Sequence, residues 1–387
     1  MSIPIIKLIA IVASIGSCTS VAYYFLCMWS AVRFRRAKHG LEESIASPPI
    51  SILKPLKGTD PEMLESFRSH CRQDYPDYEI IFGVSDRNDP VIPLVQQLRS
   101  EFPQRTIRLV FCEQNLGNNT KVSNLAQMVK EARYDRLFVN DSDIRVPANY
   151  LRSISAQLDD ANVGLVTCLY RGVDSGTLGS RLESLGISTD FAPGVLAAWQ
   201  LEGGLSFGLG STLAFHKTDL AAVGGFEAIA DYLADDYELG HRIAALGRKI
   251  ELSHTVVETF LPLYSFSEFL GHQLRWARTI RDSRPGGYFG LLFTFGLPWA
   301  TLAVVAARGA VWSWILLGIA LITRCAMACM TGKRVLHDTG IVRSMWLLPL
   351  RDFLGILIWC SSFAGHSISW RGDSFRLERG QLIRQTR

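Results

Sequence analysis

The sequence predicts an α/β domain with membrane helices at both of its ends. Charge-free apolar runs cover residues 8–32 and 285–307. Between them, short apolar segments alternate with amphipathic ones, which is typical of a parallel sheet whose strands are joined by crossover helices. Hydrophobic residues make up 48% of the chain, a high share for a soluble protein, and the excess lies in the terminal regions.

The N-terminal apolar run, residues 8–32, is long enough to cross a bilayer. Interfacial aromatic residues lie towards its end and basic residues follow it: Tyr23, Tyr24 and Trp29, then Arg33, Arg35, Arg36 and Lys38. The positive-inside rule then puts the N-terminus outside and the rest of the chain in the cytoplasm. The run continues past Cys18 into the basic cluster, so we expect an uncleaved anchor in the inner (plasma) membrane.

The C-terminal third contains three more apolar stretches: residues 285–307, 309–332 and 345–363. The first two are long enough to span a bilayer, and only Arg324 interrupts the second. The third is broken by Arg351 and Asp352, which fits either a span with an internal ion pair or a re-entrant hairpin. The hairpin is favoured, because a third crossing would put the Arg-rich tail outside.

Strand and helix signals alternate in the segment between these ends. The expected strands are residues 49–53, 79–84, 107–111 and 137–139. The expected helices are residues 61–73 and 91–102, and a third that follows 118–121 and ends at 132. Residues 54–58 are expected to form a loop, with Asp60 as N-cap of the first helix and Pro61 at its first position.

Composition and motifs exclude several classes of function. The net charge of +4 is too small to favour a nucleic-acid partner. The eight cysteines are scattered without a C-x-x-C pair, which favours buried thiols over a zinc site or a disulfide framework. The first strand is not followed by G-x-G-x-x-G, and no G-x-x-x-x-G-K-[ST] occurs, so neither a dinucleotide fold nor a P-loop is predicted.

Acidic residues follow two of the expected strands. Asp86 comes after the second strand, and Asp141 and Asp143 come after the fourth. Ligands of open α/β sheets bind beyond the carboxyl ends of the strands. Two carboxylates one residue apart can hold a hard divalent cation, with substrate phosphates as further ligands. Taken alone, such a pair is more typical of a polar turn.

Three further signals lie in the second half of the domain. Residues 207–215 are apolar and glycine-rich, which fits either a close backbone approach to a ligand or a bent core strand. Asp235 and Asp236 open a predicted helix, a place where acids are common for dipole reasons alone. His272, Arg275 and Trp276 lie on a helix over residues 267–280, whose basic face would also suit anionic lipid head groups.

Taken together, these residues carry a family resemblance. Their order is Asp86, Asp141-Ser142-Asp143, Asp235-Asp236 and Arg275-Trp276. This order resembles the ceramide glucosyltransferase family, whose signature is three Asp followed by (Q/R)-x-x-R-W and whose fold is GT-A, a Rossmann-like nucleotide-sugar-binding domain. The likeness covers residues 50–281 and extends to Trp370-Arg-Gly372 and Phe375-Arg376. One position departs from it, because His272 stands where the family has Gln or Arg.

Four segments look most like the hopanoid-associated bacterial branch of that family, which makes N-acetylglucosaminyl hopanoids: residues 140–146, 166–172, 233–237 and 274–281. The resemblance implies an inverting hexosyltransferase that uses UDP-GlcNAc or UDP-Glc as donor. It implies a membrane lipid as acceptor, with a hopanoid favoured over a sphingolipid such as ceramide. Nucleic acid is not an expected partner.

The resemblance also implies a role for each site residue. Asp141 and Asp143 would hold Mg²⁺ or Mn²⁺ on the donor diphosphate. The remaining donor-site residues are Pro55, Leu56 and Asp86 at the uridine, Lys121 at a phosphate or ribose oxygen, and Ser142. The catalytic residues are Asp236 as general base with Asp235 as the alternative, Arg275 at the diphosphate, Trp276 as an aromatic wall, and His272 in a role that is open.

Two other functions fit the same residues less well. A processive polysaccharide synthase shares the acids and the Arg-Trp pair, but two or three C-terminal spans are few for a polymer channel. An inactive nucleotide-binding scaffold has no need of acids at both the metal and the base positions. The expected domains are an anchor (1–32), a cytoplasmic GT-A domain (33–284), a C-terminal membrane region (285–365) and a basic cytoplasmic tail (366–387).

Overall fold

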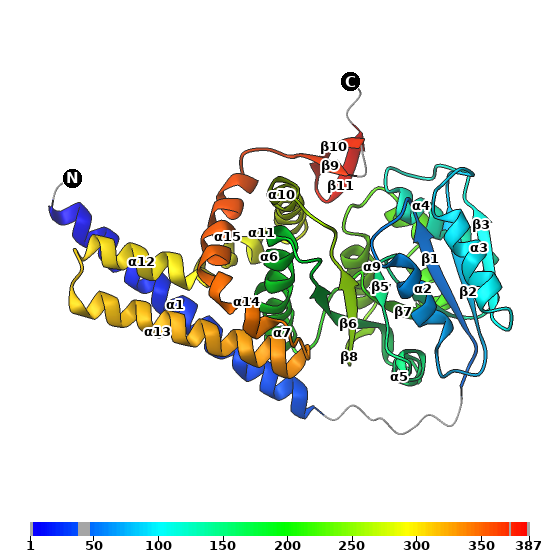
Figure 1. Cartoon of the computed structure of the whole chain (residues 1–387), viewed down its shortest axis with the longest axis horizontal. Helices are drawn as coiled ribbons and strands as arrows, with labels where there is room; N and C mark the ends of the chain where they lie inside the picture. The colour runs from blue at the N-terminus through cyan, green and yellow to red at the C-terminus, as the bar shows by residue number, and fades with distance from the viewer. Residues whose placement is uncertain (1–2, 38–46, 371–372, 385–387) are drawn as a thin grey trace. The chain divides into compact units, whose positions relative to one another are not determined.

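The computed structural model describes residues 3–37, 47–370 and 373–384 (Figure 1). Lys38 of the predicted basic cluster, and Arg371 and Gly372 of the predicted closing motif, lie outside these residues. The chain divides into two compact units. The sheet unit is Lys38–Val173, Leu201–Pro262 and Ser369–Arg387, and the helical unit is Met1–Ala37, Asp174–Gln200 and Leu263–Ile368.

The sheet unit is built on a mixed sheet whose strands are β1 Ile50–Leu56, β2 Tyr78–Val84, β3 Thr106–Phe111, β4 Arg136–Val139, β5 Ile144–Arg145, β6 Val163–Val173, β7 Leu213–His216 and β8 Lys249–Phe260. Their order over the described residues is β3-β2-β1-β4-β7-β6-β8-β5. β1 to β4 pair in parallel, as predicted, and β7 runs antiparallel to β4. The carboxyl ends of β1, β2 and β4 therefore share one edge of the sheet.

Helices connect these strands. They are α2 Met63–Cys71, α3 Ile92–Glu101, α4 Thr120–Glu131, α5 Tyr150–Gln157, α8 Lys217–Ala222 and α9 Asp235–Ala245, with a short 3₁₀ helix, η2, at Phe226–Ile229. β1 and β2 are buried along their whole length, as expected for strands covered on both faces. Phe67 of α2 packs on Phe82 of β2, with ring centroids 4.7 Å apart. This contact belongs to the main apolar core of the unit.

Two local predictions are wrong. β1 does not end at Leu53, because its pairing with β2 continues to Leu56, opposite Val84. Most of the predicted loop over residues 54–58 is therefore strand. Asp60 does not cap the next helix either: α2 begins at Met63, and the Asp60 carboxylate instead accepts a hydrogen bond from the Ser142 hydroxyl at 3.0 Å.

The predicted basic tail contains strands. A second sheet, of order β11-β10-β9, is formed by β9 Ser367–Trp370, β10 Asp373–Glu378 and β11 Gln381–Arg384. The central strand β10 and its neighbour β11 form an antiparallel hairpin that belongs to the sheet unit.

The helical unit contains α1 Ile3–Arg36, α6 Leu178–Gly186, η1 Ile187–Phe191, α7 Ala192–Glu202, α10 Phe266–Ser283, α11 Pro285–Gly290, η3 Leu291–Thr294, α12 Gly296–Ala306, α13 Val311–Ala328, η4 Cys329–Val335, α14 Ile341–Ser344, η5 Met345–Leu347 and α15 Leu348–Ser362. α1, α12 and α13 lie side by side (Figure 1). The part of the chain from 174 to 200 and from 263 to 284, predicted within the catalytic domain, groups with these helices.

Among the described residues, two helices are long and apolar enough to cross a membrane, Pro4–Arg36 and Val311–Val335. They contain the predicted run over residues 8–32 and nearly all of the one over residues 309–332. The predicted span over residues 285–307 is instead a pair of helices, Pro285–Thr294 and Gly296–Ala306, bent by 52°. The pair would count as a third span if its halves cross together. α15 is too short to be a candidate.

An ionic network, buried at Arg324 and Asp352, joins three elements of the helical unit. The Arg324 guanidinium of α13 donates to Asp352 of α15 at 2.7 Å and to Asp190 of η1 at 2.5 Å. Arg351 donates to the second oxygen of Asp190 at 2.9 Å. The ion pair considered within the last apolar stretch is therefore wrong, since Arg351 and Asp352 bind partners elsewhere. Two cations and two anions balance, which is what burial of such charges requires.

Candidate active site

The Asp141–Asp143 turn is held by buried polar groups at the carboxyl end of β4. Asn140 is fully buried and donates through Nδ2 to the carbonyl of Ser211 at 2.7 Å. The Asp141 amide donates to the carbonyl of Gly210 at 3.4 Å, and Lys54 Nζ donates to the carbonyl of Asp141 at 3.1 Å. These bonds fix the backbone, so the two carboxylates are presented by a rigid frame.

The Asp143 carboxylate accepts a hydrogen bond from the Thr259 hydroxyl of β8. Burial, and then the neighbouring charge of Asp141, raise the pKa of Asp143 to about 6. The Asp141 side chain is more open, with 42% of its surface exposed. Ser142, predicted to touch the donor, is buried with its hydroxyl on Asp60.

Lys121 links two of the predicted acids. It lies in the first turn of α4, and its Nζ is 2.8 Å from Asp141 Oδ1 and 2.9 Å from Asp235 Oδ2. Burial alone would lower the pKa of Lys121, but the charges of Asp141 and Asp235 outweigh it and raise that pKa well above the usual value. A cation at a helix N-terminus opposes the helix dipole, so these carboxylates are what hold it there.

Asp236 follows Asp235 at the start of α9 and binds the glycine-rich segment. Its Oδ2 accepts the amide of Gly210 at 2.7 Å, and its Oδ1 accepts the amide of Tyr237 at 2.8 Å. A Cβ at position 210 would lie 2.9 Å from Asp141 Oδ2 and 3.2 Å from Asp236 Oδ2. A side chain at this position would have to displace the Asp141 carboxylate, which favours glycine here; the approach to a ligand predicted for residues 207–215 stays a prediction.

Burial, and then repulsion by Asp235, raise the pKa of Asp236 to about 6. The pKa of Asp235 is also raised by burial, while Lys121 opposes that rise. The two adjacent acids thus have different surroundings: one is ion-paired, and the other is held by backbone amides.

Lys54 is a site residue that the sequence reasoning missed. Its side chain is fully buried in β1, and burial lowers its pKa to about 7 although Asp143 and Asp141 favour the charged form. A lysine inside an otherwise apolar strand was the available signal, because such a side chain is rarely buried without an acidic partner. The predicted loop at residues 54–58 concealed it.

The residues predicted at the uridine lie on neighbouring strands. Pro55 and Leu56 are the last residues of β1, and Leu56 packs into the apolar core with 2% of its surface exposed. Asp86 is exposed just beyond β2. β1 lies between β2 and β4, so the strands bearing Asp86 and Asp141 are about 10 Å apart. Asp89 is structural, since its carboxylate accepts the amides of Gly58 and Val91.

His272, Arg275 and Trp276 lie on α10 in the helical unit. His272 Nδ1 is 3.0 Å from Oε2 of Glu183 on α6, whose side chain is only 2% exposed. The His272 ring stacks on Tyr264 at 5.6 Å and meets Trp276 at 5.1 Å. His272 therefore donates an N–H to a buried carboxylate. Gln and Arg side chains also carry N–H donors, so they could make the same hydrogen bond.

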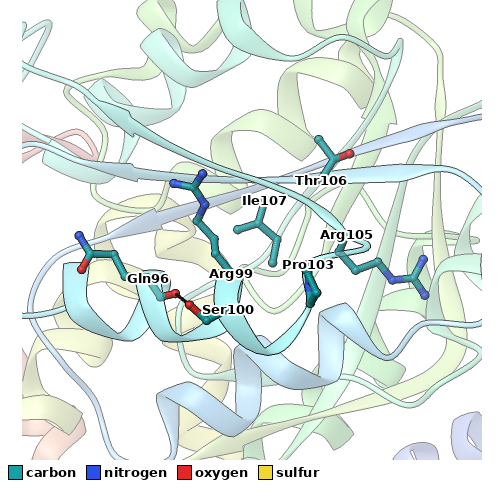
Figure 2. Close-up of a pocket in the computed structure, with 7 residues that line it drawn as sticks. All are labelled: Gln96, Arg99, Ser100, Pro103, Arg105, Thr106 and Ile107. Carbon is teal, nitrogen blue, oxygen red and sulfur yellow. Dashed lines mark hydrogen bonds between the residues drawn. The ribbon is translucent and has the colours of Figure 1, made fainter.

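The sheet unit thus gathers the carboxylates of Asp141, Asp143, Asp235 and Asp236 around fewer ammonium groups, those of Lys121 and Lys54. Among the described residues, no group of three or more His, Cys, Asp and Glu side chains is arranged to hold a metal. A cavity of 560 Å³ between α3 and β3 lies elsewhere (Figure 2). It includes Thr106 and Ile107 at the amino end of β3, and so belongs to the opposite edge of the sheet.

Comparison with known families matches residues 12–383 to the model of glycosyl transferase family 21. The chain belongs to this family. The predicted likeness to ceramide glucosyltransferases and the predicted class of enzyme, a hexosyltransferase, are thereby confirmed. The assignment of this family 21 chain to the hopanoid branch stays a prediction.

Sequence similarity to individual proteins agrees with membership of family 21. Ceramide glucosyltransferase 1 of Caenorhabditis elegans is 24% identical over 368 residues, which cover 91% of this chain and 76% of the relative. Ceramide glucosyltransferase 3 of the same organism is 26% identical over 366 residues, covering 90% and 77%.

A solved structure supports the fold. The mannosyltransferase of Pyrobaculum calidifontis, in complex with GDP-Man and Mn²⁺, matches with a TM-score of 0.57 and 18% identity. The match covers 92% of this chain and 99% of the mannosyltransferase. The predicted GT-A type of α/β fold is therefore confirmed for this family 21 protein.

We expect His272→Gln to fold as stably as the natural chain and His272→Leu to be less stable. Leucine leaves the buried Glu183 carboxylate without its donor, which costs about 1–3 kcal/mol or more. Thermal unfolding of the purified full-length chain measures the difference, with the exposed His241→Leu as control. Equal melting of His272→Leu and His241→Leu would contradict this role of His272.

Proposed function

We propose that this family 21 chain moves a hexose from a UDP-sugar to the hydroxyl of a membrane lipid, with inversion at the anomeric carbon. One observation carries the proposal. The turn predicted to meet the donor diphosphate and the acid predicted as base lie together, because Asp141 and Asp236 flank Gly210 at one edge of the sheet.

The donor side of the site suits a divalent cation. Asp141 and Asp143 would hold Mg²⁺ or Mn²⁺, and diphosphate oxygens would complete the ligands, as Mg²⁺ sites with few protein ligands do. The excess of carboxylates over ammonium groups in the cluster favours such a cation. When bound, it would stabilise the charge that develops on the leaving diphosphate. The named Mn²⁺ complex of the Pyrobaculum enzyme supports the same choice of metal.

Asp236 is the proposed general base. The acceptor hydroxyl would give its proton to the Asp236 carboxylate as its oxygen forms a bond to the anomeric carbon. The bond from that carbon to the UDP oxygen breaks, and UDP leaves with the electron pair. A carboxylate with a pKa near 6 is a stronger base than an ordinary one and is still mostly ionised at neutral pH.

The surroundings of the two adjacent acids support Asp236 over Asp235 in this role. Asp235 is buried and bound to Lys121 at 2.9 Å, so proton uptake there would break an ion pair. Asp236 accepts two amide bonds, which orient the carboxylate and leave lone pairs for a proton. Asp235 and Lys121 would instead keep the cluster assembled.

A lipid acceptor fits the membrane helices. The two candidate spans would anchor the enzyme in the inner membrane, with its sheet unit in the cytoplasm and the basic residues Arg33, Arg35 and Arg36 on the same side. The ceramide glucosyltransferase relatives support a lipid acceptor. We favour a hopanoid over ceramide because of the segments that resemble the bacterial branch, and GlcNAc or Glc as the sugar.

Product analysis tests this function. The purified chain in vesicles that contain a hydroxylated hopanoid or ceramide should transfer sugar from UDP-GlcNAc or UDP-Glc, and mass spectrometry should find one hexose per lipid molecule. Transfer to ceramide alone would correct the acceptor. A sugar polymer would overturn the proposal in favour of a processive synthase.

We expect Asp236→Asn to lower kcat about 10²-fold or more while binding of UDP-GlcNAc changes little, because the base is lost and the donor site is kept. Transfer rates and calorimetric binding measure the two effects. Asp74→Asn, at a carboxylate with 78% of its side chain exposed, is the control. Loss of donor binding in Asp236→Asn would assign Asp236 to the donor site instead.

We expect EDTA to abolish transfer and added Mg²⁺ or Mn²⁺ to restore it. Asp141→Asn and Asp143→Asn should each raise the concentration of Mn²⁺ needed for half-maximal rate, because each removes a charged ligand. Full activity in excess chelator would rule out the metal assignment.

A further inference from the structure

The sequence of the C-terminal hairpin, formed by β10 and β11, favours its strand pairing and its turn. Its strands pair Leu377 with Leu382, and both of these side chains are buried to 1% exposure. Arg379 and Gly380 connect the strands with φ values of 50° and 82°, as a type I′ turn requires. A small sheet of this kind is stable only when its apolar side chains are covered, so the hairpin needs a surface to pack on.

The hairpin packs on the segment that leads into α9. The Leu382 amide donates to the carbonyl of Asp231 at 2.7 Å, and the Leu233 amide donates to the carbonyl of Gly380 at 3.1 Å. Tyr232 and Gln381 form an antiparallel bridge between these two bonds. Residues 231–233 are thus paired to β11 as a short strand would be. The chain reaches Asp235 and Asp236 immediately afterwards.

The same hairpin meets the segment that leads into α4. Asn118 Nδ2 donates to the carbonyl of Leu382 at 2.8 Å and to Asp231 Oδ1 at 2.9 Å. Asn119 Nδ2 donates to the carbonyl of Tyr232 at 2.7 Å. α4 then begins, and Lys121 lies in its first turn.

The two segments held in this way supply the two ends of one ion pair, Lys121 and Asp235. We infer that the C-terminal hairpin is a positioning element of the active site: it joins the starts of α4 and α9, and so sets Lys121 and the Asp235–Asp236 pair against Asp141. This inference rests on the proposed function for its effect on rate. It assigns the end of the chain a part in catalysis without contact with substrate.

The expected effect follows from the geometry. Without the hairpin, the amide of Leu233 and the carbonyl of Asp231 lose their partners, and the segment before α9 gains freedom. A displacement of about 1 Å at a catalytic group can lower a rate about 10²-fold. The sheet carrying Asp141 is anchored independently, through Asn140 and Lys54. The loss is therefore expected in the assembly of the site and not in the folding of the sheet.

Asn118→Leu in the full-length chain removes the bond to the Leu382 carbonyl of the hairpin and also the direct bond to Asp231. Its rate is therefore compared with that of Leu382→Pro, which removes the bond from the hairpin to the Asp231 carbonyl and keeps the bond between Asn118 and Asp231. Asn162→Leu is a matched control, because the amide and Nδ2 of Asn162 bind Asp160 Oδ1 at 2.9 and 3.0 Å just as those of Asn118 bind Asp231. We expect kcat to fall about tenfold or more in Asn118→Leu and to change less than about twofold in Asn162→Leu. Equal rates in the two variants would overturn the inference.

A double-mutant cycle separates positioning from general stability. In a Lys121→Met background, Asn118→Leu should lower kcat little further, because the ion pair that it positions is already gone. Losses that multiply would mean that Asn118 and Lys121 act separately, and would overturn the inference that the hairpin positions Lys121.

Hydrogen exchange tests the contact between the hairpin and the segment before α9 without measuring sugar transfer. Leu382→Pro removes the N–H bound to Asp231, so amides of residues 230–236 and 117–122 should exchange faster than in the natural chain, and those of Asn162→Leu should not. Unchanged exchange in Leu382→Pro would overturn the inference. A natural chain that transfers no sugar would defeat the proposed function alone, since the exchange result still decides the role of the hairpin.

Discussion

The ion pairs of Lys121 with Asp141 and Asp235 are the contacts on which the active site depends. They join the turn after β4 to the start of α9, two segments that share no strand pairing with each other. Removing the ammonium would leave the buried Asp235 carboxylate without its cation and close to Asp141, and an uncompensated buried charge is strongly destabilising. Lys121 therefore makes a concentration of negative charge compatible with a folded chain.

The ammonium groups compensate the negative charge of the carboxylates only in part, and the remaining charge favours binding of a cation and uptake of a proton. Lys121 pairs with Asp141 and Asp235, and Lys54 donates to the backbone carbonyl of Asp141, while Asp143 and Asp236 keep raised pKa values because burial disfavours their charge. A fully neutralised cluster would have no affinity left for a divalent cation and no carboxylate basic enough to take a proton. The surrounding frame, from Asn140 to Gly210, is what allows the fold to tolerate this residual charge.

What the sequence predicted well was set by local pattern. Alternating apolar segments gave the parallel order of β1 to β4, and Asp141 and Asp143 had to follow the last of them. What it missed was set by partners distant in the chain. Lys54-Pro55 looks locally like the end of a strand, and Asp60 like a helix cap. Tertiary contacts with Asp141 and Ser142 decide otherwise.

Partners distant in the chain also explain why the roles of His272 and of the C-terminal hairpin were not predicted. His272 departs from the family motif by residue type, but its N–H reaches Glu183, a partner that no local pattern could identify. The alternation of Phe375 and Leu377 with Arg376, followed by a Gly turn, was a readable strand signal hidden by the basic charge. Polar residues at the edge of a sheet leave backbone groups that need partners. A short hairpin from a distant part of the chain can supply them, so sequence that looks like a tail can belong to the site.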